Sequence, residues 1–283
     1  MDNISKIKRQ INKTWEVKSR AGGGPHLKVA QVIAPGNWNE TDPFLMLAED
    51  WFQQGTFDFH PHRGFETVTY VLDGKLKHED NHGGKGILEP GDVQWMTAGS
   101  GIIHSEDPLP GETVHSLQLW LNLPRTQKWS EPSYQDLKGD SMPVRKETGA
   151  SIKVFSGNTG DVVSSTKNLV PVTFLEIQLE EGAEFTQDLP SSYNGFLYIL
   201  EGSGYFGSEE TFGVKNNVLW TNPVDGAEES LITIRAEKPL KVLLYAGEPI
   251  GERVVARGPF VMTSEEEINQ AIDDYYSGKF GRI

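Results

Sequence analysis

The segment YVLDG at residues 70–74 returns almost unchanged as YILEG at residues 198–202. Each copy is followed by a short strand-like run and then by a stretch rich in turn residues. Self-similarity at a fixed offset, here about 128 residues, indicates a structural unit that is used more than once. We therefore expect an all-β protein in which one antiparallel sandwich or barrel unit occurs twice.

Turn signals and alternating polarity divide the chain into its expected domains. Residues 65–80, FETVTYVLDGKLKHED, alternate between apolar and polar on both sides of Asp73-Gly74, which predicts a β-hairpin. Residues 125–150 are polar and predict a linker or a surface excursion. We expect an N-terminal domain over residues 1–130, a linker over residues 131–150 and a C-terminal domain over residues 151–283.

The end of the C-terminal domain carries a helix signal. Ser264 and Glu267 form a capping box, apolar residues follow at helical spacing, and Gly278 suits a helix C-terminus. These features predict one short helix at about residues 264–277.

The charge balance and the lack of cysteine narrow the classes of function. Forty acidic and 26 basic residues give a formal net charge of −14, and because this charge opposes a phosphate backbone we expect no direct nucleic-acid partner. Without cysteine there is no disulfide, no thiolate metal site and no cysteine nucleophile. No apolar run approaches the roughly 18 residues of a membrane span, and the first residues lack a signal-peptide core. We expect a cytoplasmic protein without a membrane partner, and a nuclear location stays open.

The histidines lie in one part of the chain only. All seven are found between residues 26 and 115. Aligning the two domains on YVLDG and YILEG, or on RGF and NGF, places no histidine pair opposite His60 and His62. Any site built on histidine therefore belongs to the N-terminal domain.

Two short motifs in that domain offer ligands for a metal ion. His60 and His62 lie two residues apart, so on a strand both imidazoles point to one face, and His104 and Glu106 repeat this spacing. Three imidazoles and one carboxylate suit one divalent ion, such as Fe(II), Mn(II), Ni(II), Cu(II), Co(II) or Zn(II). Four protein ligands leave an octahedral ion about two open positions, enough for a substrate and dioxygen.

Neighbouring polar residues have alternative interpretations. Glu66 shares the parity of His60 and His62 and competes with Glu106 for the metal. Arg63 either orients a ligand carboxylate or lies exposed on the surface. The other histidines are expected outside the site, as solvated loop residues (His78 and His82) or as structural residues (His26 and His115). Four aromatic residues either wall a pocket or fill the core: Phe57, Phe59, Phe65 and Trp95.

Several segments resemble the pirin family of the cupin superfamily. FHPHRGFETVTYVLDG, HEDNHGG, EPGDVQWMTAGSGIIHSE and LQLWLNLP are similar to its N-terminal domain, and GPFVMTSEEEINQAIDDYYSGKFG to its C-terminal tail. The resemblance implies a bicupin, with two antiparallel barrel-like domains and a second domain without metal ligands. It places His60, His62, His104 and Glu106 at the metal-binding positions of pirins, where iron is the common metal. Glu66 takes the glutamate position of the general cupin motif, a role that pirins give to the glutamate after the last histidine.

The resemblance also implies two functions of different classes. Several pirins resemble quercetin 2,3-dioxygenases, which open the central ring of a flavonol with O2 and release carbon monoxide. In such a reaction Glu106, or else Glu66, would accept the proton of the flavonol 3-hydroxyl. Alternatively, the chain is a non-catalytic, redox-sensing regulator that binds a partner protein, either a transcription factor or a metabolic enzyme. An enzyme needs a substrate-sized cavity at the metal, whereas a regulator does not.

Overall fold

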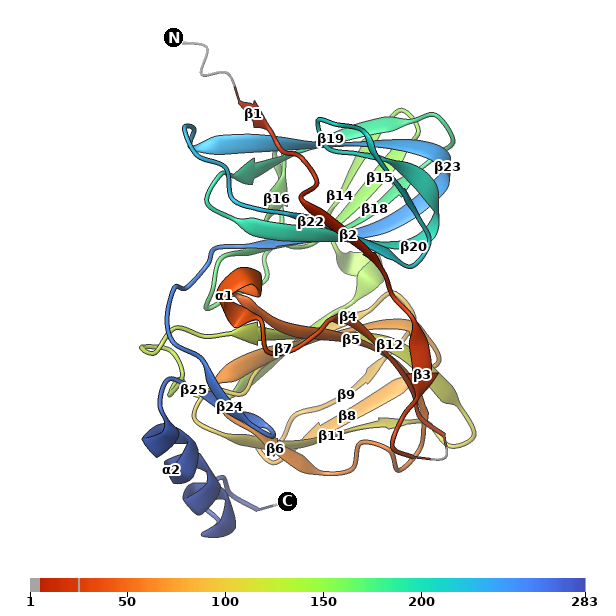
Figure 1. Cartoon of the computed structure of the whole chain (residues 1–283). Coiled ribbons are helices and arrows are strands. Elements are labelled where there is room, and N and C mark those ends of the chain that lie inside the picture. The colour runs from red at the N-terminus through yellow and green to blue at the C-terminus, as the bar shows by residue number, and fades with distance from the viewer. Residues whose placement is uncertain (1–5, 25, 283) are drawn as a thin grey trace. The chain divides into compact units, whose positions relative to one another are not determined.

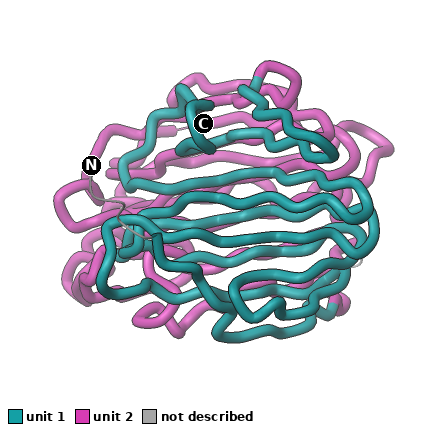
Figure 2. The backbone as a smooth tube through the Cα atoms, turned by 90° about the horizontal axis from the view of Figure 1, so that it is seen from above, with its two compact units in different colours: residues 1–18, 142–249 teal, residues 19–141, 250–283 magenta. Residues whose placement is uncertain are grey.

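The computed structural model describes residues 6–24 and 26–282. These residues form two compact units, each assembled from separate stretches of chain (Figure 2). Unit 1 contains the described part of residues 1–18 together with residues 142–249, and unit 2 contains residues 19–141 and 250–283. The predicted domains are continuous in the chain. In the structure, the N-terminal segment belongs to the unit that contains residues 142–249, and the C-terminal segment belongs to the unit that contains residues 19–141.

Unit 1 is built on one ten-stranded sheet, in which every pairing is antiparallel except that of β1 with β23. Its main order is β14 (Val144–Glu147), β15 (Ala150–Ser156), β18 (Val172–Leu179), β23 (Glu229–Gly247), β20 (Asn194–Phe206), β22 (Asn217–Thr221) and β2 (Lys13–Glu16). The strands β1 (Ile7–Lys8) and β19 (Glu184–Pro190) pair with β23, and β21 (Thr211–Val214) pairs with β20.

The long strand β23 pairs with different strands along its length. It pairs with β18 over residues 240–247 and with β19 over residues 229–235. The inward residues of β15, β18, β20, β22 and β23 are mostly Val, Ile, Leu and Phe, and they form one buried cluster. As predicted, unit 1 contains no histidine, because all seven lie in unit 2.

The two larger sheets of unit 2 are both antiparallel (Figure 1). The seven-stranded sheet runs in the order β13 (Ser133–Leu137), β10 (Val93–Thr97), β7 (Phe65–Asp73), β12 (Thr113–Asn122), β5 (Phe44–Gln53), β4 (Lys28–Ile33) and β3 (Ser19–Ala21). The four-stranded sheet runs in the order β6 (His60–His62), β11 (Ile102–Pro108), β8 (Leu76–Asp80) and β9 (Lys85–Leu88). The predicted metal motifs therefore lie on the neighbouring strands β6 and β11.

The YVLDG and YILEG segments end in the same kind of backbone corner. Gly74 and Gly202 have φ angles of +76° and +78°, and a Cβ on them would lie 2.5 Å from the Thr113 carbonyl oxygen and 2.0 Å from that of Pro239. Glycine is the residue that tolerates both conditions. At Gly74 the chain changes sheet, since β7 pairs with β10 and β12 while β8 pairs with β9 and β11. The predicted hairpin between β7 and β8 is wrong, because this corner sends the chain into the other sheet.

The C-terminal stretch adds a hairpin and a helix to unit 2. The strands β24 (Val255–Arg257) and β25 (Phe260–Met262) pair with each other, and α2 (Glu265–Tyr276) follows. The Ser264 hydroxyl accepts a hydrogen bond from the Glu267 amide at 3.2 Å, which confirms the predicted helix start. These elements bury an apolar cluster with Ile103 of β11. The remaining elements are α1 (Trp38–Thr41), a 3-10 turn (Gly139–Ser141), β16 (Asn158–Thr159) and β17 (Val162–Val163).

The helices are short, in keeping with the predicted fold class. No helix in the described residues has the length and apolar character needed to cross a membrane.

Candidate metal centre

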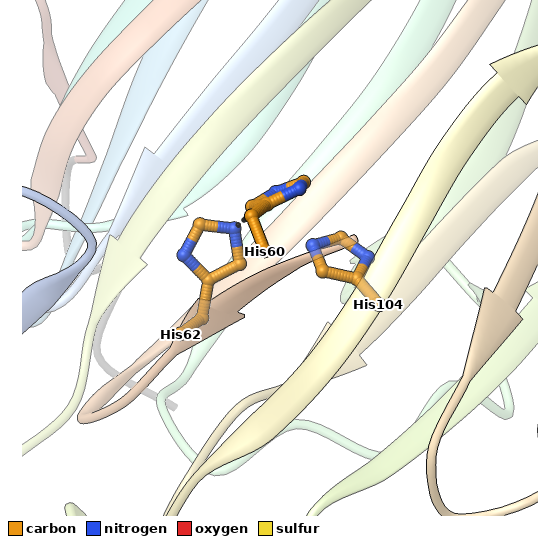
Figure 3. A group of neighbouring side chains, drawn as sticks. All are labelled: His60, His62 and His104. Carbon is orange, nitrogen blue, oxygen red and sulfur yellow. Dashed lines mark hydrogen bonds between the residues drawn. The ribbon is translucent and has the colours of Figure 1, made fainter. Parts of the chain in front are cut away.

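The strands β6 and β11 bring three histidines together. Their register pairs His60 with His104 and His62 with Ile102. Figure 3 shows His60 and His62 leaving one strand and His104 leaving the next toward a common space. A ring nitrogen of each histidine lies within 4.8 Å of the other two, and the ring centroids are 4.4–5.0 Å apart. In residues 6–24 and 26–282 this is the one group of three or more side chains close enough to share a metal ion.

Hydrogen bonding and burial prepare these imidazoles to bind a cation. His60 Nδ1 donates to the Asp58 carbonyl at 2.7 Å, which leaves its Nε2 lone pair 3.1 Å from His62 Nε2. His104 is fully buried, and neither of its ring nitrogens has a hydrogen-bond partner. A buried polar group without a partner costs about 1–3 kcal/mol, and a bound metal ion would remove that cost at one of the two nitrogens. The donor set therefore fits a divalent metal.

The local electrostatics favour the neutral form of the His62 and His104 imidazoles. Burial, reinforced by His60, lowers the pKa of His62 well below its ordinary value. Burial also lowers the pKa of His104 well below its ordinary value, and the neighbouring histidines add to the effect. The neutral imidazole is the form that coordinates a metal. At neutral pH, neither His62 nor His104 needs to lose a proton before it can bind a metal ion.

Glu106 provides a carboxylate two residues beyond His104 on β11. Thr69 Oγ1 donates to Glu106 Oε1 at 2.8 Å, and Gln118 Nε2 donates to Oε2 at 2.5 Å. Trp120 Nε1 in turn donates to Gln118 Oε1 at 3.0 Å. These bonds fix the orientation of the carboxylate, and each oxygen can still accept another interaction. Its role as a fourth ligand remains a prediction.

A cavity of about 290 Å³ adjoins the histidines. His60, His62 and Glu106 form part of its wall, and the rest combines apolar side chains such as Phe57 and Trp120 with a few polar ones. Its volume lies near the lower end of the range for small-molecule sites, roughly 300–1,000 Å³. The mixture of apolar walls and few polar groups is typical of such sites.

Comparison with known proteins identifies the family. Residues 27–121 match the family model described as Pirin, and residues 174–281 match the Pirin C-terminal cupin domain. Pirin-like protein 2 of Arabidopsis thaliana is 45% identical over 278 residues, covering 96% of this chain and 85% of that protein. The chain belongs to the pirin family.

Solved structures agree with the bicupin fold expected of a pirin. GK1651 from Geobacillus kaustophilus is 52% identical and has a TM-score of 0.86, over 88% of this chain and 100% of that chain. A structure of quercetin 2,3-dioxygenase from Acinetobacter baumannii is 29% identical and has a TM-score of 0.83, over 98% of this chain and 99% of that one. The family and the fold class predicted from the sequence are therefore confirmed.

In this pirin, Glu66 lies outside the histidine cluster. Gly64, with φ +88°, turns the chain from β6 in one sheet to β7 in the other, so alternation does not continue from His62 to Glu66. The Phe65 ring lies 5.0 Å from that of His62, whereas Glu66, on the opposite face of β7, accepts a hydrogen bond from Thr97 Oγ1 at 2.6 Å. The parity argument that made Glu66 a competing ligand is wrong at this corner.

Arg63 links β6, the strand of His60 and His62, to the C-terminal helix. It is only 4% exposed, so the alternative of a surface residue is wrong. Its NH1 donates to Asp274 of α2 at 2.9 Å and its Nε donates to the Ser100 carbonyl at 2.6 Å. Arg63 thus binds a carboxylate of α2 and not one at the metal centre.

The four aromatic candidates divide between the cavity and the core. Phe57 lines the cavity. Phe59 packs against the apolar cluster of the C-terminal hairpin and helix, and Phe65 backs the His62 ring. Trp95 is 1% exposed on β10 and does not line the cavity.

The remaining histidines follow their predictions only in part. His82 is exposed as predicted, whereas His26 was expected to be structural and is exposed as well. His115 stacks on Trp51 and binds Glu49 Oε1 at 2.7 Å. His78 was expected in a solvated loop, but it lies fully buried on β8. That prediction is wrong, because β8 is an inner strand of the four-stranded sheet, between β9 and β11.

Asp50 is a cavity residue that the sequence analysis did not single out. It lies on β5 on the same face as Met46, Ala48 and Phe52, which also line the cavity. Burial, with smaller effects of Glu106 and Glu49, raises the pKa of Asp50 to about 7. The available signal was an acidic residue on the otherwise apolar face of a strand.

Proposed function

We propose that this protein is an iron-dependent dioxygenase that opens the central ring of a flavonol or a similar enolisable phenol. The observation that carries the proposal is the cavity of about 290 Å³ whose wall includes His60, His62 and Glu106. A regulator has no need for such a space beside its metal. The structural likeness to quercetin 2,3-dioxygenase from Acinetobacter baumannii supports the same reaction class.

The proposed metal ligands are His60, His62, His104 and Glu106. The three histidines would supply imidazole nitrogens, and Glu106 would add a carboxylate oxygen. A bound iron would supply Lewis acidity toward a phenolate oxygen and a route for electrons to dioxygen. Mn, Ni, Cu, Co and Zn are alternatives for the same donor set.

The protein's own groups would deprotonate and enclose the substrate. Glu106 is the proposed general base for the 3-hydroxyl, because its carboxylate lines the cavity and is held by Thr69 and Gln118. Glu66, the other candidate base, lies on the opposite face of β7 and bonds with Thr97. Phe57 and Trp120 would pack against the aromatic rings and exclude water from the reacting centre.

Quercetin consumption under oxygen tests the proposal. Protein stripped of metal and reloaded anaerobically with Fe(II) is mixed with quercetin, and the loss of visible absorbance is followed together with carbon monoxide release. We expect turnover by the wild type and none by His60→Ala. His115→Ala is the matched control, because His115 pairs with Glu49 outside the cluster and its loss should leave turnover intact.

Absence of turnover has a clear meaning only when iron is bound. If the wild type holds one iron per chain and consumes no flavonol, the dioxygenase proposal is wrong. The redox-sensing regulator would then be the better hypothesis, and its partner protein would be sought by comparing Fe(II) and Fe(III) forms.

A further inference from the structure

A third buried histidine, after His62 and His104, lies beside the proposed metal ligands. His78 on β8 is fully buried, and its ring centroid is 5.4 Å from that of His104. In the register of β8 and β11, His78 pairs with Glu106 and Asp80 pairs with His104. Directly paired residues of an antiparallel sheet project from the same face. His78 and Asp80 therefore share the face that carries His104 and Glu106.

Asp80 holds His78 in one orientation. Its Oδ2 lies 3.2 Å from His78 Nε2, and its Oδ1 accepts hydrogen bonds from the amides of His82 at 2.7 Å and Gly84 at 2.9 Å. A Cβ on Gly84 would lie 2.0 Å from Asp80 Oδ2, so the absence of a side chain there makes room for the carboxylate. Since a carboxylate accepts and does not donate, this contact selects the His78 tautomer in which Nε2 carries the proton.

This tautomer leaves His78 Nδ1 as a hydrogen-bond acceptor. Nδ1 is buried and has no partner, and the same is true of both nitrogens of His104. Two imidazoles joined by one N–H···N bond of about 3 Å have centroids roughly 5 Å apart. The observed separation is 5.4 Å and the bond is not formed in this structure, so the two rings would have to turn or move together to make it. Tyr134 lies on His78 as well, with ring centroids 5.5 Å apart, and limits its movement.

The geometry points to His78 as a positioning residue that accepts the N–H of metal-bound His104, with Asp80 fixing the tautomer of His78. A metal-binding histidine presents one nitrogen to the metal and normally donates the N–H of the other to a fixed acceptor. His78 Nδ1 supplies such an acceptor inside the barrel, where water would otherwise have to serve. The inference rests on the metal site of the proposed function and does not depend on the reaction that occurs there.

Co(II) titration of the metal-free full chain tests this role without any substrate. We expect His78→Phe, which keeps an aromatic ring but has no acceptor, to weaken Co(II) binding by about 10–100-fold. His78→Gln restores a carbonyl acceptor and should recover part of the affinity. The matched control is His115→Phe, which removes a histidine from another His–carboxylate pair of the same unit and should change nothing.

Asp80→Asn probes the tautomer and serves if His78→Phe does not fold. The asparagine amide can donate to His78 Nε2, so the proton would move to Nδ1 and present a donor where His104 needs an acceptor. We expect Asp80→Asn to weaken Co(II) binding as His78→Phe does and to shift the visible absorption bands of bound Co(II). A purely structural role would lower the thermal stability of the metal-free chain without moving those bands.

The outcomes separate this inference from the metal site itself. If the wild type binds no Co(II), the metal site is wrong and the inference fails with it. If the wild type binds Co(II) and both His78→Phe and Asp80→Asn match it in affinity and spectrum, the role of His78 is wrong and the metal site stands.

Discussion

Glu66 and Glu106 are both near the histidines in the sequence, but their carboxylates occupy different environments. Glu106 lines the cavity and receives hydrogen bonds from Thr69 and Gln118. Glu66 is fully buried, and its Oε2 has no hydrogen-bond partner. Burial raises the pKa of Glu66 to about 7, although Thr97 and Trp95 partly oppose the shift. Only Glu106 is placed to act on a metal or a substrate in the cavity.

Glu66→Gln should stabilise the metal-free protein at high pH. The unfolded chain releases this proton near the ordinary pKa of 4.5 and the folded chain near 7. Between these values the folded state binds more protons, so the stability of the wild type falls as pH rises from about 4.5 to 7. The variant cannot lose stability in this way. Its free energy of unfolding should match that of the wild type near pH 4 and exceed it by about 3 kcal/mol at pH 8. Urea unfolding at both pH values measures the difference, and an equal gain at both would contradict the assignment.

Glu106→Gln should act on the metal instead. An amide oxygen is a neutral and weaker donor than a carboxylate, so we expect the affinity for Fe(II) or Co(II) to fall by about tenfold or more. Glu66→Gln is the control and should leave the affinity unchanged. Competition with a coloured chelator measures both constants. Unchanged binding by Glu106→Gln would remove this residue from the ligand set.

At the scale of elements, the corner at Gly64 sets the direction of β6, which carries His60 and His62. Its amide donates to the Gly99 carbonyl at 2.9 Å, and its own carbonyl accepts from Lys128 Nζ at 2.8 Å. A Cβ at this position would lie 2.0 Å from the Val261 carbonyl oxygen. The corner therefore joins β6, the end of β10 and the C-terminal hairpin at one point.

Gly64→Ala should destabilise the protein and weaken metal binding together. Positive φ alone costs a non-glycine residue roughly 1–2 kcal/mol, and the contact with Val261 adds to this because backbone atoms must move. Gly111→Ala separates the cost of positive φ from the cost of the close contact. Gly111 has φ +83° but open space around its Cβ position. Urea unfolding should show a loss of about 3 kcal/mol or more for Gly64→Ala and a smaller loss for Gly111→Ala. Equal losses would show that the close contact contributes nothing.

Local pattern predicted those parts of the site that lie within single strands. His60 with His62, and His104 with Glu106, each occupy one uninterrupted strand, so the two-residue rule correctly put the residues of each pair on one face. The pairing of β6 with β11 then brings the three histidines together. The rule failed at Gly64 and Gly74, where the chain changes sheet and the alternation restarts. Asp50 was not among the predicted site residues and His78 was wrongly predicted to lie in a solvated loop, because the burial of both depends on which strands become neighbours. That choice is made by long-range pairing, which residues close in sequence do not encode.

At the scale of the whole molecule, each unit holds a terminal segment through one buried arginine. In unit 1, Arg9 donates hydrogen bonds to Ser230 Oγ and to the carbonyls of Pro190, Ser191, Tyr193 and Asn222. Arg9 itself belongs to the terminal segment that it holds. In unit 2 the arginine lies in the body of the unit instead, since Arg63 follows β6 and binds Asp274 of the C-terminal helix. The guanidinium suits both positions because its donors form a rigid fork that satisfies several acceptors at once.

These two anchors should differ in their effect on the metal. Arg9→Met and Arg63→Met each leave buried acceptors without a donor, and each should cost about 3–5 kcal/mol of unfolding free energy. Arg63 directly follows His62 and binds the Ser100 carbonyl shortly before β11, so its loss should also weaken Co(II) binding. Arg9 belongs to the unit without histidines, so Arg9→Met should bind Co(II) as the wild type does. Urea unfolding and Co(II) titration on the same preparations test both statements. Equal weakening of metal binding by the two variants would mean that the histidine site depends on the folding of both units and not on its own unit alone.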